Sequence, residues 1–387
     1  MRRASDATPR LTRIALTDTA DLERIARDCA GVDEPRAPWL PTLPARLPLA
    51  DLRPTADVQA QGDLILGLAD EPERQRQPLV RLVQGVDRGL SIVGGPASGK
   101  STVLDLLAGQ RQPERVVRVP AALEGAWDAV ERLADEPVRG ALVLLDDVDA
   151  LCTRFPADYA TEFAARLERV VRAAGAHGST VVLTAQRLAG PVARLTELLP
   201  LRAVLPTASR LDFVAAGGDP ARYDRSAPPG RAELNGRTVQ FALPEESTRG
   251  RDAVRDAPPL WQPRGALSLV VCRGRAGVSA ALAAAVPGHR IVQLDELSPS
   301  ARAEDLDGPD PLVIVGDPDA WQRQWSLFAR LRGAHDVILA TSCAGEFRML
   351  SGGRGLPPYA DDDGTRAWVL APAGTVARVR LPDAPRI

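Results

Sequence analysis

The chain has 387 residues, of which 45% are hydrophobic and 25% are charged, as expected for a globular protein with a sizeable core and, from its length, two or three domains. Its 48 Lys and Arg residues nearly balance its 50 Asp and Glu residues, so the net charge of -2 argues against polybasic binding to DNA or to a membrane surface, although not against a local basic groove. No stretch approaches the roughly 18–20 apolar residues that span a bilayer, and no apolar core follows the first residues, so we expect neither direct membrane insertion nor export.

Residues 1–52 form a mixed N-terminal lead-in that ends in a proline-rich segment. A modest helix is predicted over residues 19–29. In residues 37–52 prolines alternate with leucines and with Trp39, a pattern that excludes a regular helix because proline lacks an amide hydrogen. We expect an extended strap whose apolar side chains pack on a neighbouring surface.

From residue 53 to residue 247 short apolar runs alternate with amphipathic stretches, which predicts an α/β domain with a parallel sheet and crossover helices. Asn235 and Gly236, between two alternating runs, predict a two-residue β-hairpin. A polar, proline-containing linker is predicted over residues 248–264. The predicted strands cover residues 90–93, 115–119, 141–145, 180–184 and 202–205, and the predicted helices cover residues 100–107, 124–134, 159–174, 192–198 and 211–216.

Residues 265–387 repeat the pattern of the first block with shorter loops, which predicts a tandem duplication. Four segments match in the same order along the chain. The matched pairs are residues 91–109 with 268–286, 142–151 with 312–321, 179–187 with 335–343, and 230–244 with 365–382.

The cysteines and histidines are too scattered to suggest a metal site or a disulfide framework, so a reducing cytoplasm fits the sequence. These residues are Cys29, Cys152, Cys272, Cys343, His177, His289 and His335.

Residues 94–101 match G-x-x-x-x-G-K-[ST] between an apolar strand and a helix, which is the context that a phosphate-binding loop requires. Its glycines let backbone N–H groups curl around phosphate oxygens, and the following helix directs its positive end at the same charge. Lys100 is the only lysine in the chain, and its compact ammonium suits β- and γ-phosphates better than a planar guanidinium. The hydroxyl of Ser101 is expected to bind Mg²⁺. The predicted ATP-binding residues are Gly94, Gly95, Pro96, Ala97, Ser98, Gly99, Lys100, Ser101 and Thr102.

Two carboxylates follow the predicted strand at residues 141–145. Asp146 is expected to hold Mg²⁺ through water, and Asp147 to polarise the attacking water. Asp147 is one methylene shorter than the usual Glu, which lowers the expected hydrolysis rate more than the expected affinity. Gln186, at the end of the neighbouring predicted strand, is expected to sense the γ-phosphate. Candidate phosphate or inter-subunit contacts, none of them singled out as an arginine finger, are Arg187, Arg210, Arg231 and Arg237.

The second copy lacks these groups in the sequence alignment. Val278 takes the place of Lys100, and Gly316 takes that of Asp146. The strand matched to residues 179–187 ends at Cys343 without a Gln-Arg pair. We expect the second copy to be a structural or partner-binding domain that does not hydrolyse ATP.

These motifs resemble the FtsK/SpoIIIE motor ATPases, with particular similarity to the tandem ATPase domains of actinobacterial type VII secretion proteins of the EccC kind and to FHA-linked FtsK/SpoIIIE proteins. The resemblance covers residues 38–382 and is carried by the phosphate-binding loop, the Asp-Asp strand end, the Gln-Arg strand end and residues 67–80. It implies two tandem RecA-like P-loop NTPase domains, the second smaller and degenerate. It also implies ATP and Mg²⁺ as cofactors of an assembly that moves a polymer.

The resemblance leaves the polymer open, because FtsK and SpoIIIE move double-stranded DNA and EccC-like proteins move secreted protein. We expect a homo-oligomer or a membrane-embedded translocation partner, and a cytoplasmic chain that reaches the inner face of the membrane through partners. The chain contains no upstream ATPase copy, FHA domain or winged-helix DNA reader, which suggests a truncated gene product or a cytosolic partner of a membrane core.

Two other functions fit the sequence. The chain is alternatively an ATP-binding, hydrolysis-poor interaction module of a larger secretion or translocation complex. An AAA+ remodeller fits the acidic strand end but would require a small helical lid that the sequence does not predict.

Overall fold

The computed structural model describes residues 17–30, 40–52, 63–245, 257–298, 306 and 310–382. The chain divides into two compact units, Met1–Pro41 with Pro72–Arg76 and Thr42–Glu71 with Gln77–Ile387, and the second unit holds both β-sheets. The first unit contains α1 (Thr19–Asp28), which confirms the first predicted helix. Trp39 and most of the predicted linker lie outside the described residues.

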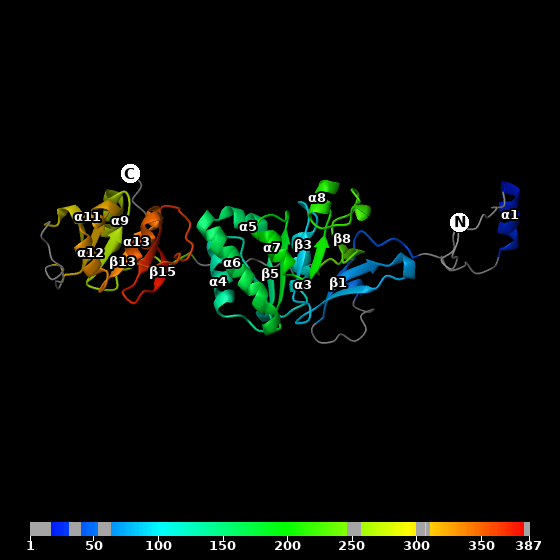
Figure 1. Ribbon diagram of the computed structural model, residues 1–387, viewed down its shortest axis with the longest axis horizontal. Helices are drawn as coiled ribbons and strands as arrows, with labels where there is room; N and C mark the ends of the chain where they lie inside the picture. The colour runs from blue at the N-terminus through cyan, green and yellow to red at the C-terminus, as the bar shows by residue number, and fades with distance from the viewer. Residues whose placement is uncertain are drawn as a thin grey trace. The chain divides into compact units, whose positions relative to one another are not determined.

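The first sheet has the strand order β2-β1-β9-β8-β7-β3-β6-β5-β4. Figure 1 labels four of these strands, β1, β3, β5 and β8. Its strands are β1 (Asp63–Asp70), β2 (Leu79–Val83), β3 (Gly89–Val93), β4 (Val116–Arg118), β5 (Leu142–Leu145), β6 (Thr180–Ala185), β7 (Leu201–Val204), β8 (Arg231–Leu234) and β9 (Arg237–Phe241). Its helices are α2 (Leu49–Leu52), α3 (Lys100–Ala108), α4 (Leu123–Asp135), α5 (Val148–Arg154), α6 (Ala157–Ala174), α7 (Pro191–Glu197) and α8 (Arg210–Ala215).

The centre of this sheet is parallel and buried on both faces. β3 lies between β6 and β7, and β5 and β4 follow β6 outward, all with parallel pairing. Along β5, Val143 and Leu145 pack with the core that contains α4, α6 and α7, whereas Leu142 and Leu144 pack with the core that contains α3. Strands that are covered on both faces read as continuous apolar runs, which is why the sequence predicted β3, β5 and β6.

Antiparallel strands extend the sheet beyond β7, so it is mixed rather than purely parallel. β8 and β9 form the predicted hairpin, with Asn235 at φ 51° and Gly236 at φ 71°. β9 pairs with β1, and β1 pairs with β2, both antiparallel. The sequence did not predict the β1–β2 hairpin or the two-turn helix α5.

The proline-rich strap packs as expected but ends in a short helix. Leu43, Leu47, Leu49 and Leu52 are buried, and the amide of Leu243 donates to Leu47 O at 2.7 Å. The expectation of no helix was wrong for α2, because no proline interrupts its four residues.

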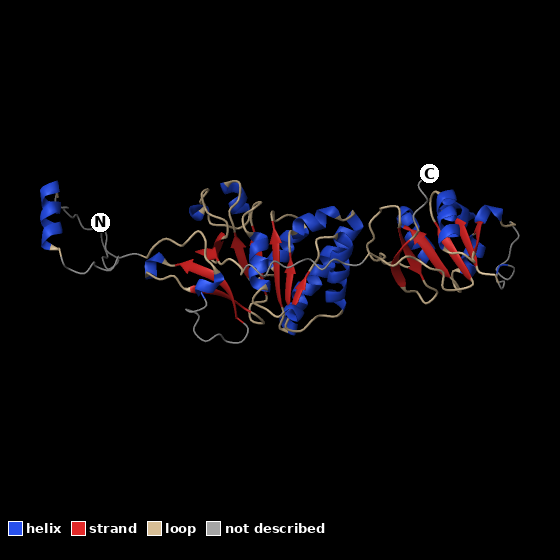
Figure 2. Ribbon diagram, turned by 180° about the vertical axis from the view of Figure 1, so that it is seen from behind, coloured by secondary structure: helices blue, strands red, loops and turns tan. Residues whose placement is uncertain are grey.

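The second sheet has six strands in the order β11-β12-β10-β13-β14-β15, and Figure 2 shows helices beside the strands of both sheets. β10 to β13 are parallel, and β14 and β15 are antiparallel. The strands are β10 (Leu267–Val271), β11 (Arg290–Gln293), β12 (Leu312–Gly316), β13 (Asp336–Ala340), β14 (Arg366–Leu370) and β15 (Val376–Arg380), and the helices are α9 (Arg275–Ala285), α11 (Pro318–Arg323), α12 (Trp325–Leu331) and α13 (Phe347–Ser351).

The pairing of these strands corrects the alignment of the two copies. In the first sheet β6 separates β3 from β5, whereas β12 pairs directly with β10. β13 flanks β10 on the other side and leads into an antiparallel hairpin, as β7 does beside β3. Residues 312–321 therefore correspond to β6 rather than to β5, and β11 is the counterpart of β5. Short apolar strands resemble one another, so order along the chain alone assigned them wrongly.

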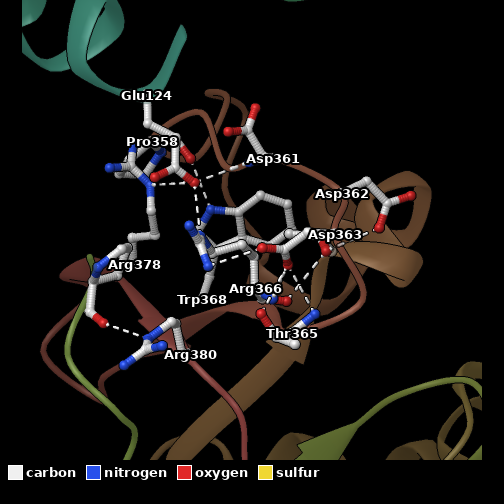
Figure 3. Close-up of polar contacts among 12 residues, drawn as sticks. Glu124, Pro358, Asp361, Asp362, Asp363, Thr365, Arg366, Trp368, Arg378 and Arg380 are labelled. Atoms are coloured by element: carbon white, nitrogen blue, oxygen red, sulfur yellow. Dashed lines mark hydrogen bonds and ion pairs between the residues drawn. The ribbon is translucent and has the colours of Figure 1, made fainter. Parts of the chain in front are cut away.

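Polar contacts join α4 to the hairpin of the second sheet (Figure 3). Glu124 accepts hydrogen bonds from Arg366 Nε and from the amide of Asp361, both at 3.0 Å. Arg378 forms a two-pronged ion pair with Asp128, at 3.1 Å for each bond. These paired charges are half-buried, so desolvation offsets much of their attraction and their net contribution to stability is small.

An aromatic contact accompanies these ion pairs. The ring of Tyr359 lies 5.0 Å from Phe155 and 5.1 Å from Tyr159, edge-on to both, and only 9% of the residue is exposed. Phe155 follows α5 directly in the chain. A side chain of the second domain therefore completes the core that covers α4, α5 and α6.

Candidate functional site

The loop between β3 and α3 has a backbone that requires glycine. Gly99 has φ 104° and Ala97 has φ 56°. A Cβ atom on Gly94 would lie 2.6 Å from Leu205 Cβ and 2.7 Å from Ser98 Oγ, closer than real Cβ atoms approach. The loop is therefore a tight curl of backbone, as a phosphate-binding loop requires.

Three backbone hydrogen bonds hold the loop from behind. Gly94 donates to Ala185 O at 3.1 Å, and Gly95 donates to Pro206 O at 2.9 Å. The amide of Gly230 donates to Ser98 O at 2.8 Å. The ends of β6 and β7 and the turn before β8 thus fix the loop before any ligand binds.

The N-terminus of α3 faces this loop, because Gly99 is its N-cap and Lys100 its first residue. The first amides of a helix have no partner within it and favour an anion. Ser101 is exposed and Thr102 is half-buried at this end, whereas Pro96 and Ala97 are exposed on the loop.

Lys100 is buried, with 6% exposure, although it carries a charge. Its ammonium donates to Gly94 O and Gly95 O, both at 3.1 Å, and lies 3.7 Å from Asp147 Oδ1. Burying an ammonium is costly unless it is paired, and here two carbonyl groups and one carboxylate serve that purpose. The cation is held directly over the loop.

The two acids after β5 are tied to β6 by Thr184. The hydroxyl of Thr184 donates to Asp146 Oδ1 and accepts a 2.8 Å hydrogen bond from the amide of Asp147. Asp147 has φ 45° and ψ 53°, a left-handed conformation that Asp tolerates better than most residues. The sequence motifs assign no role to Thr184, although a hydroxyl near the end of a buried strand, beside the acidic strand end, is a signal for one.

Burial and the neighbouring charge of Asp146 raise the pKa of Asp147, although the ammonium of Lys100 opposes the shift. Its Oδ1 atom is buried and makes no hydrogen bond. A raised carboxyl pKa improves a group that must accept a proton near neutral pH.

Gln186 is exposed at the carboxyl end of β6, next to the acids at the end of β5. The backbone amides of Gln186 and Arg187 both donate hydrogen bonds to Asp149 Oδ2, at 3.1 Å each. Of the other arginines, Arg231 is bound to Gln240 and Leu43 O, and Arg237 pairs with Glu71. These internal contacts leave Arg187 and Arg210 as the candidates for contact with a phosphate or a neighbouring subunit.

The residues fit Mg-ATP better than a metal bound by protein alone. In the described part of the chain no group of three or more His, Cys, Asp and Glu is arranged to hold a metal ion. Mg²⁺ usually takes one or two protein ligands and completes its shell with phosphate oxygens and water. Ser101 and Asp146 can supply those ligands. They lie beside a glycine loop that is too tightly packed at Gly94 to accept a side chain.

The corresponding loop of the second domain differs from the predicted alignment. α9 begins at Arg275 after the left-handed Gly274, as α3 begins at Lys100 after Gly99. Arg275, and not Val278, therefore stands at the lysine position. The connection from β10 to α9 is residues 272–274, whereas that from β3 to α3 is residues 94–99.

Ion pairs fill the space beside this shortened loop. Arg275 pairs with Asp295, which follows β11, and with Asp317 at 3.3 Å, which follows β12. Asp295 thus follows the counterpart of the acidic strand, a position that the sequence alignment had assigned to Gly316. The second domain keeps an acid there but lacks the loop length for a phosphate cradle.

Among the described residues no helix has the length and apolar character needed to cross a bilayer. No protein-family model and no curated protein sequence matches the chain.

The fold is α/β in two tandem domains, as the sequence predicted, although both sheets are mixed rather than parallel, and it matches the fold of the tandem ATPase domains of EccC. ATPases 2 and 3 of EccC from Thermomonospora curvata, solved in complex with a signal sequence peptide, match with a TM-score of 0.52 and 14% identity over 90% of this chain and 100% of that chain. The cytoplasmic domain of the type VII secretion ATPase EccC from the same organism matches with a TM-score of 0.52 and 14% identity over 95% of this chain and 67% of that chain. This likeness establishes the fold.

Proposed function

We propose that this chain is an ATP-hydrolysing motor subunit of the FtsK/SpoIIIE type. The observation that carries the proposal is the position of Lys100, buried over a glycine loop and within 3.7 Å of an acid whose pKa is raised. The ammonium of Lys100 is held by two backbone carbonyl groups and by one carboxylate at 3.7 Å, whereas a bound triphosphate would give it a full counter-charge at hydrogen-bond distance.

Each residue of the site has a role in this proposal. The loop amides and Lys100 would hold the β- and γ-phosphates, and Ser101 with Asp146 would hold Mg²⁺. Bound Mg²⁺ supplies charge neutralisation on the phosphate oxygens. Asp147 would accept a proton from the attacking water, and Gln186 would contact the γ-phosphate. Thr184 keeps Asp146 and the backbone of Asp147 in place.

We propose that the polymer is a polypeptide. EccC, which shares the tandem fold, has been solved with a signal sequence peptide. The near-neutral net charge of -2 also offers little general attraction to DNA phosphates. In this proposal the chain works in the cytoplasm as a homo-oligomer or on a membrane-embedded partner.

Steady-state ATP turnover of the wild type, Lys100→Ala and Arg172→Ala tests the proposal. Arg172 is a matched control because it forms only an exposed pair with Glu168. Turnover should fall by at least about 100-fold in Lys100→Ala, the scale of lost charge stabilisation in phosphoryl transfer, and remain unchanged in Arg172→Ala. Equal turnover in Lys100→Ala and the wild type would refute a motor. Stimulation by a signal peptide supports a polypeptide cargo, and stimulation by duplex DNA contradicts it.

A second function, ATP binding with little hydrolysis, is favoured by one observation. Asp147 is a short side chain in a left-handed conformation beside Lys100, so its carboxylate lies close to the ammonium rather than extended past it. Tight, Mg²⁺-dependent ATP binding without turnover at any protein concentration would establish this function instead.

A further inference from the structure

α5 connects the acids of β5 to the loop that follows β6 through one side chain. The Oδ2 atom of Asp149, the second residue of α5, accepts hydrogen bonds from the backbone amides of Gln186 and Arg187, at 3.1 Å each. These two backbone amides belong to the loop that follows β6, the next strand of the sheet, and not to α5. The carboxylate therefore holds a loop more than 30 residues away in the chain, across the carboxyl edge of two neighbouring parallel strands.

This contact differs from ordinary helix capping. An acid in the first turn of a helix usually accepts from the free amides of its own helix. Asp149 instead uses one oxygen for two foreign amides, and its Oδ1 atom is buried without a hydrogen bond. A buried, unsatisfied carboxylate oxygen costs free energy, so capping alone does not account for the arrangement.

Thr184 makes a second link between the carboxyl ends of β5 and β6. It lies in β6, two residues before Gln186. It contacts Asp146 and the backbone of Asp147, whereas Asp149 contacts the backbone of Gln186. With both links in place, the Gln186 backbone has a fixed position relative to the two acids. The Gln186 side chain itself is exposed, so the backbone of this loop sets where it points.

We propose that Asp149 is a positioning residue for the γ-phosphate sensor. By holding two consecutive amides it sets the direction in which Gln186 leaves β6, and thereby how well the site distinguishes ATP from ADP. This inference rests on the proposed ATPase function, but it concerns a residue to which neither the sequence motifs nor that proposal assigns a role. Asp149 touches neither nucleotide nor water in this scheme and acts only through the loop.

The chemistry of the contact decides which substitutions test it. Asn keeps a carbonyl oxygen that can accept both amides and removes the charge, whereas Ala removes the acceptor. Asp149→Asn should therefore retain the positioning and Asp149→Ala should lose it. Thr153→Ala is the matched control on the same helix, because the Thr153 hydroxyl bonds only to carbonyl groups of α5, those of Asp149 and Ala150.

The first measurement is backbone hydrogen exchange of the peptide that spans residues 185–188, in the protein without nucleotide. Exchange should be faster in Asp149→Ala and close to wild type in Asp149→Asn and Thr153→Ala. The second is the affinity for ADP and for a non-hydrolysable ATP analogue, by titration with a fluorescent nucleotide. Asp149→Ala should keep its ADP affinity while its preference for the ATP analogue falls several-fold, as expected for loss of one positioned hydrogen bond.

The proposal is overturned if Asp149→Asn is as impaired as Asp149→Ala, because Asp149 would then act through its charge. It is also overturned if ADP and the ATP analogue weaken equally, since Asp149 would then support the whole pocket, or if exchange at residues 185–188 does not change. Failure of the ATPase function itself would show in the wild type, as absence of nucleotide binding. It would leave the exchange result, which needs no nucleotide, to decide whether Asp149 holds the loop.

Discussion

The ammonium of Lys100 lies 3.7 Å from Oδ1 of Asp147, and this distance places the proposed phosphate-binding cation beside the proposed catalytic acid. The pair is too long for a strong hydrogen bond and is only partly shielded from water, because 43% of the Asp147 side chain is exposed. The two residues are therefore partners that a ligand can separate. A triphosphate would take over Lys100 and leave the carboxylate of Asp147 free for water.

Lys100→Arg should weaken nucleotide binding, although it keeps the charge. The ammonium occupies a site with 6% exposure between Gly94 O and Gly95 O, and a planar guanidinium, which is bulkier than an ammonium, does not fit that space. We expect ATP affinity to fall by at least about 10-fold in a fluorescent-nucleotide titration, the scale of one lost charge-assisted contact. Affinity within twofold of wild type would show that charge alone is sufficient there.

Asp147→Asn should stabilise the nucleotide-free protein while abolishing turnover. Burial and Asp146 raise the pKa of Asp147 above its ordinary value, so the folded state binds that proton more tightly than the unfolded state does. Ionisation of Asp147 therefore costs stability as the pH rises through the raised pKa. Asn removes this cost and also tolerates the left-handed backbone.

The pH dependence gives this prediction its control. Thermal unfolding of Asp147→Asn should show a higher Tm than wild type at pH 7, and the difference should disappear at acid pH, where Asp147 is protonated in both states. Asp363→Asn should do the opposite at pH 7. There, burial would raise the pKa of Asp363, but hydrogen bonds from Thr365 outweigh it and lower the pKa. A lower Tm for Asp147→Asn at pH 7 would mean that the attraction of Lys100 dominates.

Much of the first domain follows from the sequence because its signals are local. Strands buried on both faces give continuous apolar runs, and each predicted helix and strand end lies within two residues of the structure. The turn at Asn235 depends on two neighbouring residues only. The backbone around Gly94 and Gly99 likewise follows from a motif that is contiguous in the chain.

What the sequence did not predict depends on contacts between distant residues. The roles of Thr184 and Asp149 exist only because β5 and β6 are neighbours, which no local pattern states. The wrong alignment of the second copy has the same origin, since the identity of β12 is set by its pairing with β10. Arg275 was missed because the loop before it is shorter than the motif assumes.

The chain should bind one nucleotide, because only the first domain has a loop long enough to surround phosphates. The second domain has three residues between β10 and α9, and Arg275 is already paired with Asp295 and Asp317. Calorimetric titration should give a stoichiometry of one for the wild type and no binding for Lys100→Ala. Arg275→Lys, which places a lysine at the start of α9, should not create a second site. Binding of two nucleotides by either protein would show that the shortened loop can still hold phosphate.

The contact of the second domain with α4–α6 should depend on Tyr359 and Glu124 and much less on an exposed pair nearby. Tyr359→Ala would leave a cavity between Phe155 and Tyr159, which we expect to cost about 3 kcal/mol. Glu124→Gln would remove the charge that faces the half-buried Arg366 and Arg378. Each arginine keeps a second carboxylate partner, so the expected cost is about 2 kcal/mol, the scale of a lost hydrogen bond to a charged group.

Arg348→Ala is the matched control for these two variants. It breaks the 3.4 Å pair between Arg348 and Asp158, whose side chains are 59% and 69% exposed, and should cost less than about 1 kcal/mol. Urea unfolding of the three variants measures the difference. If the second domain unfolds separately in Tyr359→Ala, an earlier transition should appear, because the lost contact lies between the domains and not within either core. Three equal and small effects would mean that the two domains are held together elsewhere and that the paired charges of Figure 3 only orient them.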